Sequence, residues 1–263
     1  MAAARAALLA LPALLAAAAL AHAKLPLPPY LKPCSIKLSS KEMTKCAVKH
    51  ANEALPHVTK GDRKYRIPSM DPLLVDSLQV DDGHGPLGLN MLITQAKVYG
   101  IPKTVINNVE FDFKEKQVRY DAFLPSVNIQ SKYNISGQIL VLPIIGHGDA
   151  NLTLENVHVT YEYEFALEKM EDKEVYFIPK KHTDFRFNTT RLYIHLDNLF
   201  NGDRLLGENT NKFMDENWEE LLVSVGPIFS TAISEIIHNI LTNVFKLVPA
   251  TDAFLDAGEW KKL

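Results

Sequence analysis

The sequence predicts an α+β fold in which a long C-terminal helix is wrapped by a strongly curved antiparallel β-sheet. Apolar side chains recur at every second position from about Leu87 to Leu199, the pattern of strands with one dry and one wet face. From Asn217 to Leu247 they recur instead at helical spacing. The alternation also changes phase twice along the strand region. Because such slips bend a sheet, we expect strong curvature.

The first 23 residues have the three parts of a cleavable signal peptide. Arg5 supplies the positive start, an Ala/Leu run from Ala6 to Ala21 supplies the apolar core, and Ala21-His22-Ala23 supplies small residues at the cut. The run is about 16 residues long where a bilayer-spanning helix needs ~20, so we disfavour a membrane anchor. We therefore expect a secreted, extracellular chain whose mature part, residues 24–263, is a single domain.

The mature N-terminus combines a proline-rich lead-in with the two cysteines of the sequence. Four prolines between residues 24 and 33 favour extended chain and exclude helix. Cys34 directly follows this stretch and Cys46 lies twelve positions later, and in an oxidising compartment we expect them to form one disulfide bond. A reactive thiol would need a neighbouring base and a reducing compartment, and the sequence indicates neither.

The first helix is predicted directly after the lead-in. Ser39 and Glu42 form a capping-box pattern, and apolar residues then follow at helical spacing as far as Gly61. Further along, Asp71-Pro72 predicts a short helical turn that runs through Leu73, Leu74 and Leu78.

The strand region predicts antiparallel hairpins, because its connections are too short for crossover helices. The two longest alternating runs are Tyr133 to Ile145 and Val157 to Leu167. We expect turns at residues 114–116, 146–148 and 171–173, where charged residues or glycines gather.

Two phase slips predict bulges in these strands. Leu152 and Leu154 are out of phase with the run from Val157, and Phe185 and Phe187 are out of phase with the run from Leu192. A curved sheet of long strands with a large dry face needs a long element to wrap.

The segment from Asn217 to Leu247 is that element, a helix ~45 Å long at 1.5 Å per residue. Pro227 should kink the helix or divide it after Val225, because proline removes a backbone donor and clashes with the preceding turn. Glu235 and His238 within the apolar stretch argue against a membrane-spanning helix and thus against integral membrane association.

Three N-glycosylation sequons begin at Asn134, Asn151 and Asn188. If all three carry glycans, these asparagines face water, and the outer face of their strands is fixed.

The sequence contains no recognised catalytic or cofactor motif, so we expect no enzyme, no cofactor and no metal. Nucleophile elbows, zinc-binding histidine pairs and phosphate-cradling glycine loops are all absent. The best remaining cluster is Asp81-Asp82-Gly83-His84-Gly85, which we interpret as a solvated turn. The net charge of −3 becomes −4 once Arg5 is removed, which leaves no basic field for nucleic acid.

Aromatic and aliphatic residues on the inward phase of the strands and helix are the candidate ligand-binding residues. Most such residues form ordinary core, but a sheet wrapped around a helix leaves room for an apolar cavity with a few polar anchors. Tyr120, Tyr161 and Tyr163 are the alternatives for offering a hydroxyl group. The full candidate set is Leu89, Met91, Phe111, Phe113, Tyr120, Ile139, Val141, Tyr161, Tyr163, Phe165, Phe229, Ile233 and Ile237.

Several of these features together resemble the insect takeout and juvenile-hormone-binding proteins. The resemblance rests on the proline-rich start, Cys34 with Cys46, the stretch Ile67–Leu73, the run Tyr133–Ile144 before Gly146-His147-Gly148, and Asn217-Trp218. It covers essentially the whole mature chain. It implies an elongated, TULIP-like fold with a tunnel for a small lipophilic ligand such as a terpenoid hormone or a fatty acid.

One departure from the family concerns the cysteines. The juvenile-hormone carriers proper have a second disulfide, for which this chain lacks the residues, so the resemblance points to the takeout branch. We thus expect a carrier in haemolymph or another extracellular fluid, with a receptor or a membrane as an open alternative partner at delivery. The alternative function is an extracellular recognition or lipid-surface-binding protein without a dedicated small-molecule cargo.

Overall fold

A computed structural model describes residues 24–81, 89–140 and 142–262 of the chain. The predicted signal peptide, most of the cluster from Asp81 to Gly85, and Val141 lie outside the described residues. The helices are α1 (Ser40–Val58), α2 (Arg204–Glu216), α3 (Trp218–Phe245) and α4 (Ala250–Ala253). The strands are β1 (Cys34–Ser35), β2 (Leu73–Asp81), β3 (Asn90–Tyr99), β4 (Val105–Asp112), β5 (Gln117–Ile139), β6 (Leu142–Lys169), β7 (Val175–Asn188), β8 (Arg191–Leu196) and β9 (Phe254–Leu255).

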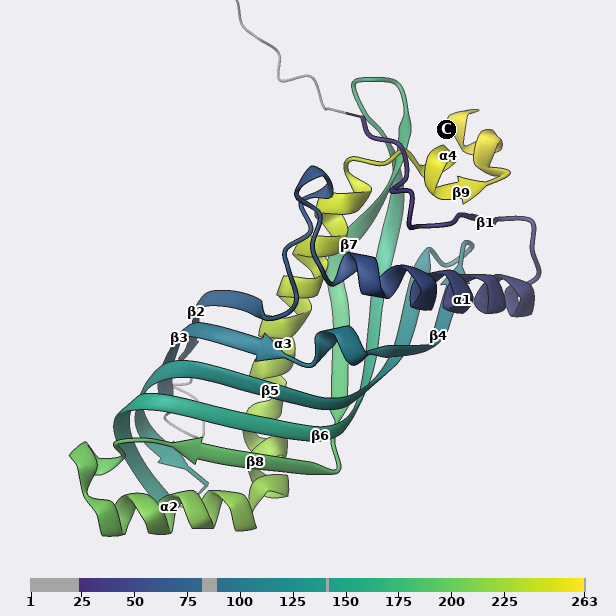
Figure 1. Cartoon of the computed structure of the whole chain (residues 1–263). Helices are drawn as coiled ribbons and strands as arrows, with labels where there is room; N and C mark the ends of the chain where they lie inside the picture. The colour runs from purple at the N-terminus through teal and green to yellow at the C-terminus, as the bar shows by residue number, and fades with distance from the viewer. Residues whose placement is uncertain (1–23, 82–88, 141, 263) are drawn as a thin grey trace, which may run out of the picture.

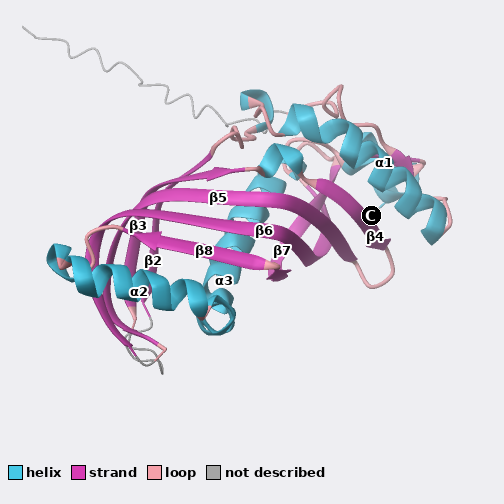
Figure 2. Ribbon diagram, turned by 60° about the horizontal axis from the view of Figure 1, so that its bottom comes forward, coloured by secondary structure: helices cyan, strands magenta, loops and turns pink. Residues whose placement is uncertain are grey.

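The predicted fold class is confirmed: a curved antiparallel sheet arches around the long helix α3 (Figure 1). The described strands run in the order β2-β3-β5-β6-β7. Strand β4 pairs with the part of β5 that β3 does not reach, and β8 pairs with the part of β6 that β7 does not reach. The very long strands β5 and β6 form the spine of the sheet, because each changes neighbours halfway along its length. Helices α1 and α2 lie toward opposite ends of the sheet (Figure 2).

The sheet bends where β5 and β6 both change phase. Inward residues of β6 switch from Leu154 to Val157, and their partners on β5 switch from Val127 to Leu124, so the pairing register stays continuous. Asn156 adopts a left-handed conformation with φ of 51° at this point. The predicted phase slip in β6 is therefore real. It is a bend shared by two strands rather than a bulge that shifts their register.

The second predicted slip was wrong. Phe187 belongs to β7 and Leu192 to β8, so the change of phase marks a turn between two strands. Both strands pair with β6, β7 along residues 158–169 and β8 along residues 150–155. Real register shifts lie elsewhere, among them one in β6 and β7 between Tyr163 and Phe165.

Two local predictions were overturned by strand pairing. The expected helical turn after Asp71-Pro72 is strand β2, which pairs with β3 from Leu73 onward. The expected turn at Gly146 and Gly148 lies inside β6. A Cβ atom on Gly146 would lie 2.8 Å from the Tyr133 hydroxyl oxygen, and one on Gly148 would lie 2.7 Å from the Asp197 carbonyl oxygen. These glycines therefore allow close approach of another chain segment.

Helix α3 is continuous from Trp218 to Phe245, so of the two predicted effects of Pro227, a kink or a division, the division is wrong. Pro227 has no backbone N–H to donate to the carbonyl of Val223, four positions earlier. Val223 is 79% exposed. Water can satisfy that carbonyl at an exposed position, which explains why the helix continues through the proline.

Helices α1 and α2 each fasten to a strand through one asparagine. The Asn52 amide of α1 donates to the Ile106 carbonyl of β4 at 2.8 Å and accepts from the Ile106 N–H at 2.9 Å. The Asn211 amide of α2 makes the same pair of bonds with Leu196 of β8, both at 2.9 Å. In both cases a side chain completes backbone hydrogen bonds at a sheet edge, where unpaired groups would otherwise invite aggregation.

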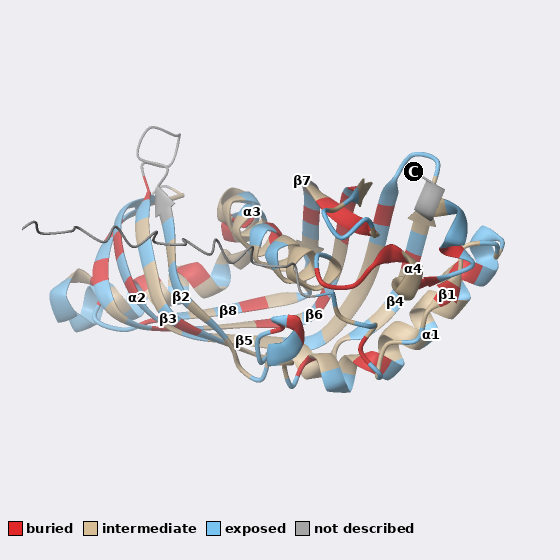
Figure 3. Cartoon of the chain, turned by 90° about the horizontal axis from the view of Figure 1, so that it is seen from above, coloured by how far each residue is buried: buried red, intermediate tan, exposed pale blue. Residues whose placement is uncertain are grey.

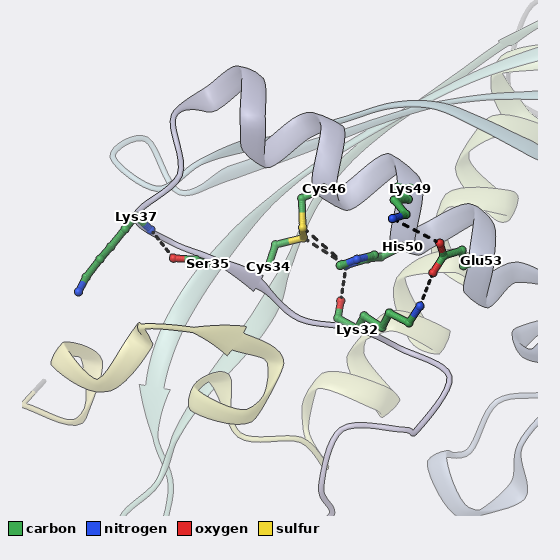
Figure 4. The surroundings of a disulfide bond; sticks show 8 residues. All are labelled: Lys32, Cys34, Ser35, Lys37, Cys46, Lys49, His50 and Glu53. Atoms are coloured by element: carbon green, nitrogen blue, oxygen red, sulfur yellow. Dashed lines mark hydrogen bonds and ion pairs between the residues drawn. A yellow bond between two sulfur atoms is a disulfide. The ribbon is translucent and has the colours of Figure 1, made fainter.

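The N-terminal disulfide is present between Cys34 and Cys46 and ties β1 to α1 (Figure 4). His50 of α1 lies beside it, with Nδ1 3.6 Å from both sulfur atoms and 2.9 Å from the Lys32 carbonyl oxygen. Strand β1 in turn pairs in parallel with β9, where Cys34 faces Phe254. The disulfide therefore joins the start of the chain, the first helix and the C-terminal segment.

Candidate ligand-binding site

Helix α3 carries an apolar stripe that the protein itself covers only in part. Ile228, Phe229, Ala232, Ile236 and Ile240 are half-buried, and none of them belongs to the buried clusters found among the described residues. By length and composition alone, α3 could span a membrane, yet only 17% of its most apolar 18-residue window is buried. A core helix of that composition would be mostly buried. Figure 3 shows mainly intermediate residues along α3.

The opposite side of the same helix packs firmly. Ile233, Ile237 and Leu241, four residues apart, contact the cluster that contains Tyr161 and Tyr163. Toward the other end of the helix, Leu221 and Val225 contact a second cluster. The helix is thus fixed by one row of side chains, while the neighbouring stripe carries apolar surface without a buried partner cluster.

Three tyrosines lie together on the inner face of the sheet. Tyr120 of β5 faces Tyr161 of β6, which faces Phe185 of β7. The rings of Tyr120 and Tyr163 stack with centroids 6.1 Å apart. Burial raises the pKa of Tyr163 well above its usual value, and the adjacent Tyr120 raises that pKa further. Burial likewise raises the pKa of Tyr120, so both hydroxyl groups stay neutral and can donate or accept a hydrogen bond.

The structure assigns eleven of the thirteen candidate residues to two clusters. Eight belong to or pack against the cluster around β4, β5, β6 and the C-terminal segment: Phe111, Phe113, Tyr120, Tyr161, Tyr163, Phe165, Ile233 and Ile237. Three belong to or pack against the cluster at the opposite end of the sheet: Leu89, Met91 and Ile139. Phe229 belongs to the half-buried stripe, and Val141 lies outside the described residues.

Part of the first group packs against protein. Phe111 meets Phe254 edge to face at 5.6 Å, Phe113 lies 5.7 Å from Trp260, and Phe165 stacks on Phe177 at 4.0 Å. The contacts of Phe111 and Phe113 were hidden from the sequence pattern because Phe254 and Trp260 are far away along the chain.

A groove between β7 and α3 was missed by the sequence reasoning. Its volume is about 1110 Å³, just above the range of roughly 300–1,000 Å³ for pockets that bind small molecules. One wall is residues 184–188 of β7, and the other is the face of α3 that includes Leu222, Gly226, Ser230, Ser234 and His238. The four-residue spacing of small and polar residues on an otherwise apolar helix was the available signal.

The charged residues described along this groove are largely paired. Arg186 contacts two carboxylates, with Nη2 3.0 Å from Glu162 Oε1 and Nε 3.1 Å from Asp184 Oδ2. Glu235 also lines the groove and is exposed. The described lining therefore carries more negative than positive charge.

The three sequon asparagines, Asn134, Asn151 and Asn188, are all exposed. Asn188 also lies on the rim of the groove. Glycan attachment itself stays a prediction.

Comparisons with known proteins agree with this architecture. A family model for haemolymph juvenile hormone binding proteins matches residues 11–255. The circadian clock-controlled protein daywake is 24% identical over 236 residues in Drosophila yakuba and 22% identical in Drosophila melanogaster, in each case over 86% of this chain and 88% of the relative. The crystal structure of Epiphyas postvittana Takeout 1 superposes with a TM-score of 0.74 at 26% identity, covering 86% of this chain and 100% of that one.

Proposed function

Since this chain belongs to the family of haemolymph juvenile hormone binding proteins, we propose that it is a secreted, non-catalytic carrier of a small lipophilic ligand. The ligand occupies apolar space between α3 and the concave face of the sheet. The signal-peptide pattern and the disulfide between Cys34 and Cys46 support an extracellular site of action. The family model, whose name states that its members bind juvenile hormone, supports a lipophilic cargo.

The observation that carries this proposal is the half-buried stripe on α3. The stripe lies on the helix around which the sheet arches (Figure 1), and its apolar side chains are half-buried without belonging to a buried cluster of the described residues. Burying apolar surface contributes roughly 25 cal/mol per Å², or about 0.8 kcal/mol per CH₂ group. A terpenoid or acyl chain would thus gain several kcal/mol beyond its costs of immobilisation without any catalytic group.

The direct test is extraction of the secreted protein with organic solvent, followed by mass spectrometry. We expect a lipophile near one molecule per chain. An interior that is empty after purification, together with no uptake of an added fatty alcohol or terpenoid ester, would contradict the proposal. Binding to liposomes without uptake of any single small molecule would support the alternative of a lipid-surface-binding protein.

A matched pair of variants locates the site. Ile236→Gln places an amide in the stripe and should weaken binding by about tenfold or more, because the amide loses its hydrogen bonds to water. Leu205→Gln makes the same kind of change at a residue of α2 that is 70% exposed, so it should leave binding unchanged.

A further inference from the structure

We propose that Asn151 carries an N-linked glycan whose first sugar is held in a hollow on the outer face of the sheet. The site is separate from the apolar stripe on α3 and does not depend on any ligand there. Two features support it: the hydrogen bonds that orient the Asn151 side chain, and the residues that line the hollow beside it.

Asn151 lies on the outer face of β6, the face turned away from α3. Its chain neighbours, Ala150 and Leu152, belong to or pack against a cluster that reaches α3. Successive side chains of a strand point to opposite faces, so Asn151 points outward, where it is exposed. It pairs with Gln130 of β5 on one side and with His195 of β8 on the other, so the sequon lies within the sheet rather than at its edge.

A chain of amide hydrogen bonds fixes which atom of Asn151 points away from Asn128. Gln130 Nε2 donates to Asn128 Oδ1 at 3.0 Å, and Asn128 Nδ2 donates to Asn151 Oδ1 at 2.7 Å. Asn128 Nδ2 also donates to the hydroxyl oxygen of Thr153, the third residue of the sequon, at 2.8 Å. The oxygen of Asn151 is therefore held, and Nδ2, the atom to which a glycan bonds, is directed away from Asn128.

Glycan attachment has to precede the pairing of β6. In this reaction the Asn151 Nδ2 atom bonds to the anomeric carbon of a lipid-pyrophosphate-linked oligosaccharide, the lipid pyrophosphate leaves, and one amide proton is released. A transferring enzyme reaches the sequon only before β5 and β8 flank it. The glycosylated amide keeps its oxygen, so the bond from Asn128 forms when the sheet closes and orients the attached sugar.

The hollow beside Asn151 has a volume of about 320 Å³, at the lower end of the range of roughly 300–1,000 Å³ for pockets that bind small molecules. It extends over the neighbouring strands β3, β5, β6 and β8 (Figure 1). On β3 its wall includes Gln95, which has φ of 54° and lies where the register with β5 shifts between Thr94 and Lys97. Such a bulge bends the strand and redirects its side chains, so the outer face is uneven at this point.

The lining of the hollow suits a neutral sugar. Two lysines, Lys97 and Lys132, and two aspartates, Asp149 and Asp197, line it, so these four charges balance. Lys132 Nζ lies 2.5 Å from Asp149 Oδ1, and His195 Nε2 lies 3.0 Å from Asp197 Oδ1. Sugar hydroxyl groups accept hydrogen bonds from ammonium groups and donate them to carboxylates. A neutral polyhydroxyl ring therefore uses both kinds of partner without adding net charge.

The experiment measures how fast peptide N-glycosidase, which converts a glycosylated asparagine to aspartate, releases the glycan from the native protein. The full chain would be secreted behind an efficient signal peptide from cells that add no α1,3-linked core fucose, so that every attached glycan is a substrate. Peptide mapping by mass spectrometry gives the rate at Asn151. Asn128→Ala should speed native release by about tenfold, because one or two hydrogen bonds hold the amide. After denaturation both proteins should release the glycan at the same rate.

A second variant tests the hollow itself. Lys97→Ala removes a donor from its wall at an exposed position, so the protein should fold as before. Native release at Asn151 should become about threefold faster, because the first sugar loses one hydrogen bond.

The matched control is Asn108→Ala, the same substitution at another half-buried asparagine, whose amide donates to Glu110 and Asp121. It should leave native release at Asn151 as in the unmodified protein. A secreted chain with bare Asn151, or native release that neither Asn128→Ala nor Lys97→Ala speeds, would overturn the inference. An equal effect of Asn108→Ala and Asn128→Ala would do the same, because it would show general loosening of the sheet.

Discussion

The side-chain amide of Asn156 donates a hydrogen bond of 2.9 Å to the hydroxyl oxygen of Thr190. This bond fastens the bend of β6 to the turn that connects β7 with β8. The Thr190 N–H also donates to the Glu155 carbonyl at 3.0 Å, so the bend and the turn are held by backbone as well as side-chain bonds. Because β7 and β8 pair with different halves of β6, this junction sets the angle between the two halves of the sheet.

Asn156→Ala should lower the free energy of unfolding by about 1–3 kcal/mol. Alanine loses the bond to Thr190 and adopts φ of 51° at a steric cost that asparagine tolerates better. Urea unfolding followed by circular dichroism measures the change. Asn156→Gly removes the same bond but relieves the backbone cost, so it should destabilise less. If glycine proved more damaging than alanine, the left-handed backbone would not be the constraint at this position.

Asn52→Ala should lower the free energy of unfolding by about 2 kcal/mol, because both hydrogen-bonding groups of Ile106 lose their partner at the edge of β4. Hydrogen exchange of the Ile106 amide should become faster in the same variant. Lys49→Ala, at an exposed position of α1, is the control and should change stability by less than about 0.5 kcal/mol. Unaltered exchange at Ile106 would show that Asn52 does not protect the strand edge.

Stability should fall as the pH rises above about 10, partly through Tyr133. Burial, with a smaller effect of the nearby Asp197, raises the pKa of Tyr133 to about 12, and its hydroxyl donates to the Asp197 carbonyl at 2.6 Å. The unfolded chain ionises this tyrosine first, so above pH 10 it binds fewer protons than the folded protein, and unfolding becomes easier.

Tyr133→Phe tests this dependence. The variant should be less stable at neutral pH, because the Asp197 carbonyl loses a donor, but its stability should decline less steeply between pH 10 and 12. Urea midpoints measured across this range give the slope. Identical slopes for the two proteins would assign the alkaline loss of stability to other groups.

Secretion predicts a specific mature protein. Expression in insect cells should release a chain that begins at Lys24, and intact-mass measurement before and after glycosidase treatment should reveal glycans. Asn188→Gln, at an exposed position, should remove one glycan without loss of folding. A secreted chain that retains Met1 would contradict the predicted cleavage.

The local patterns succeeded where neighbouring residues determine structure. The capping box at Ser39 starts α1 as predicted, and the backbone N–H of Ser39 donates to Glu42 Oε2 at 3.1 Å. The disulfide was predictable because two cysteines in an oxidising compartment have one intramolecular pairing. The predicted last helix, Asn217 to Leu247, matches α3 to within two residues at each end.

The failures arose where distant partners decide. Leu73 lies in a strand because it pairs with β3, and Gly146 lies inside β6 because it pairs with Ile135 of β5. Helix α2 was not predicted. Its attachment to β8, through the hydrogen bonds between Asn211 and Leu196, joins two separate elements. Periodicity shows which face of an element is dry but not what will cover that face.

The sequence by itself determined the class of fold, the disulfide, the family and the supply of apolar side chains. These properties follow from residue spacing, covalent chemistry and composition, which are local or additive. The tertiary structure decided how those side chains are divided: Phe165 packs on Phe177, whereas Phe229 stays half-buried on α3. It also created the groove between β7 and α3, because only chain folding brings Phe187 and Leu222 together.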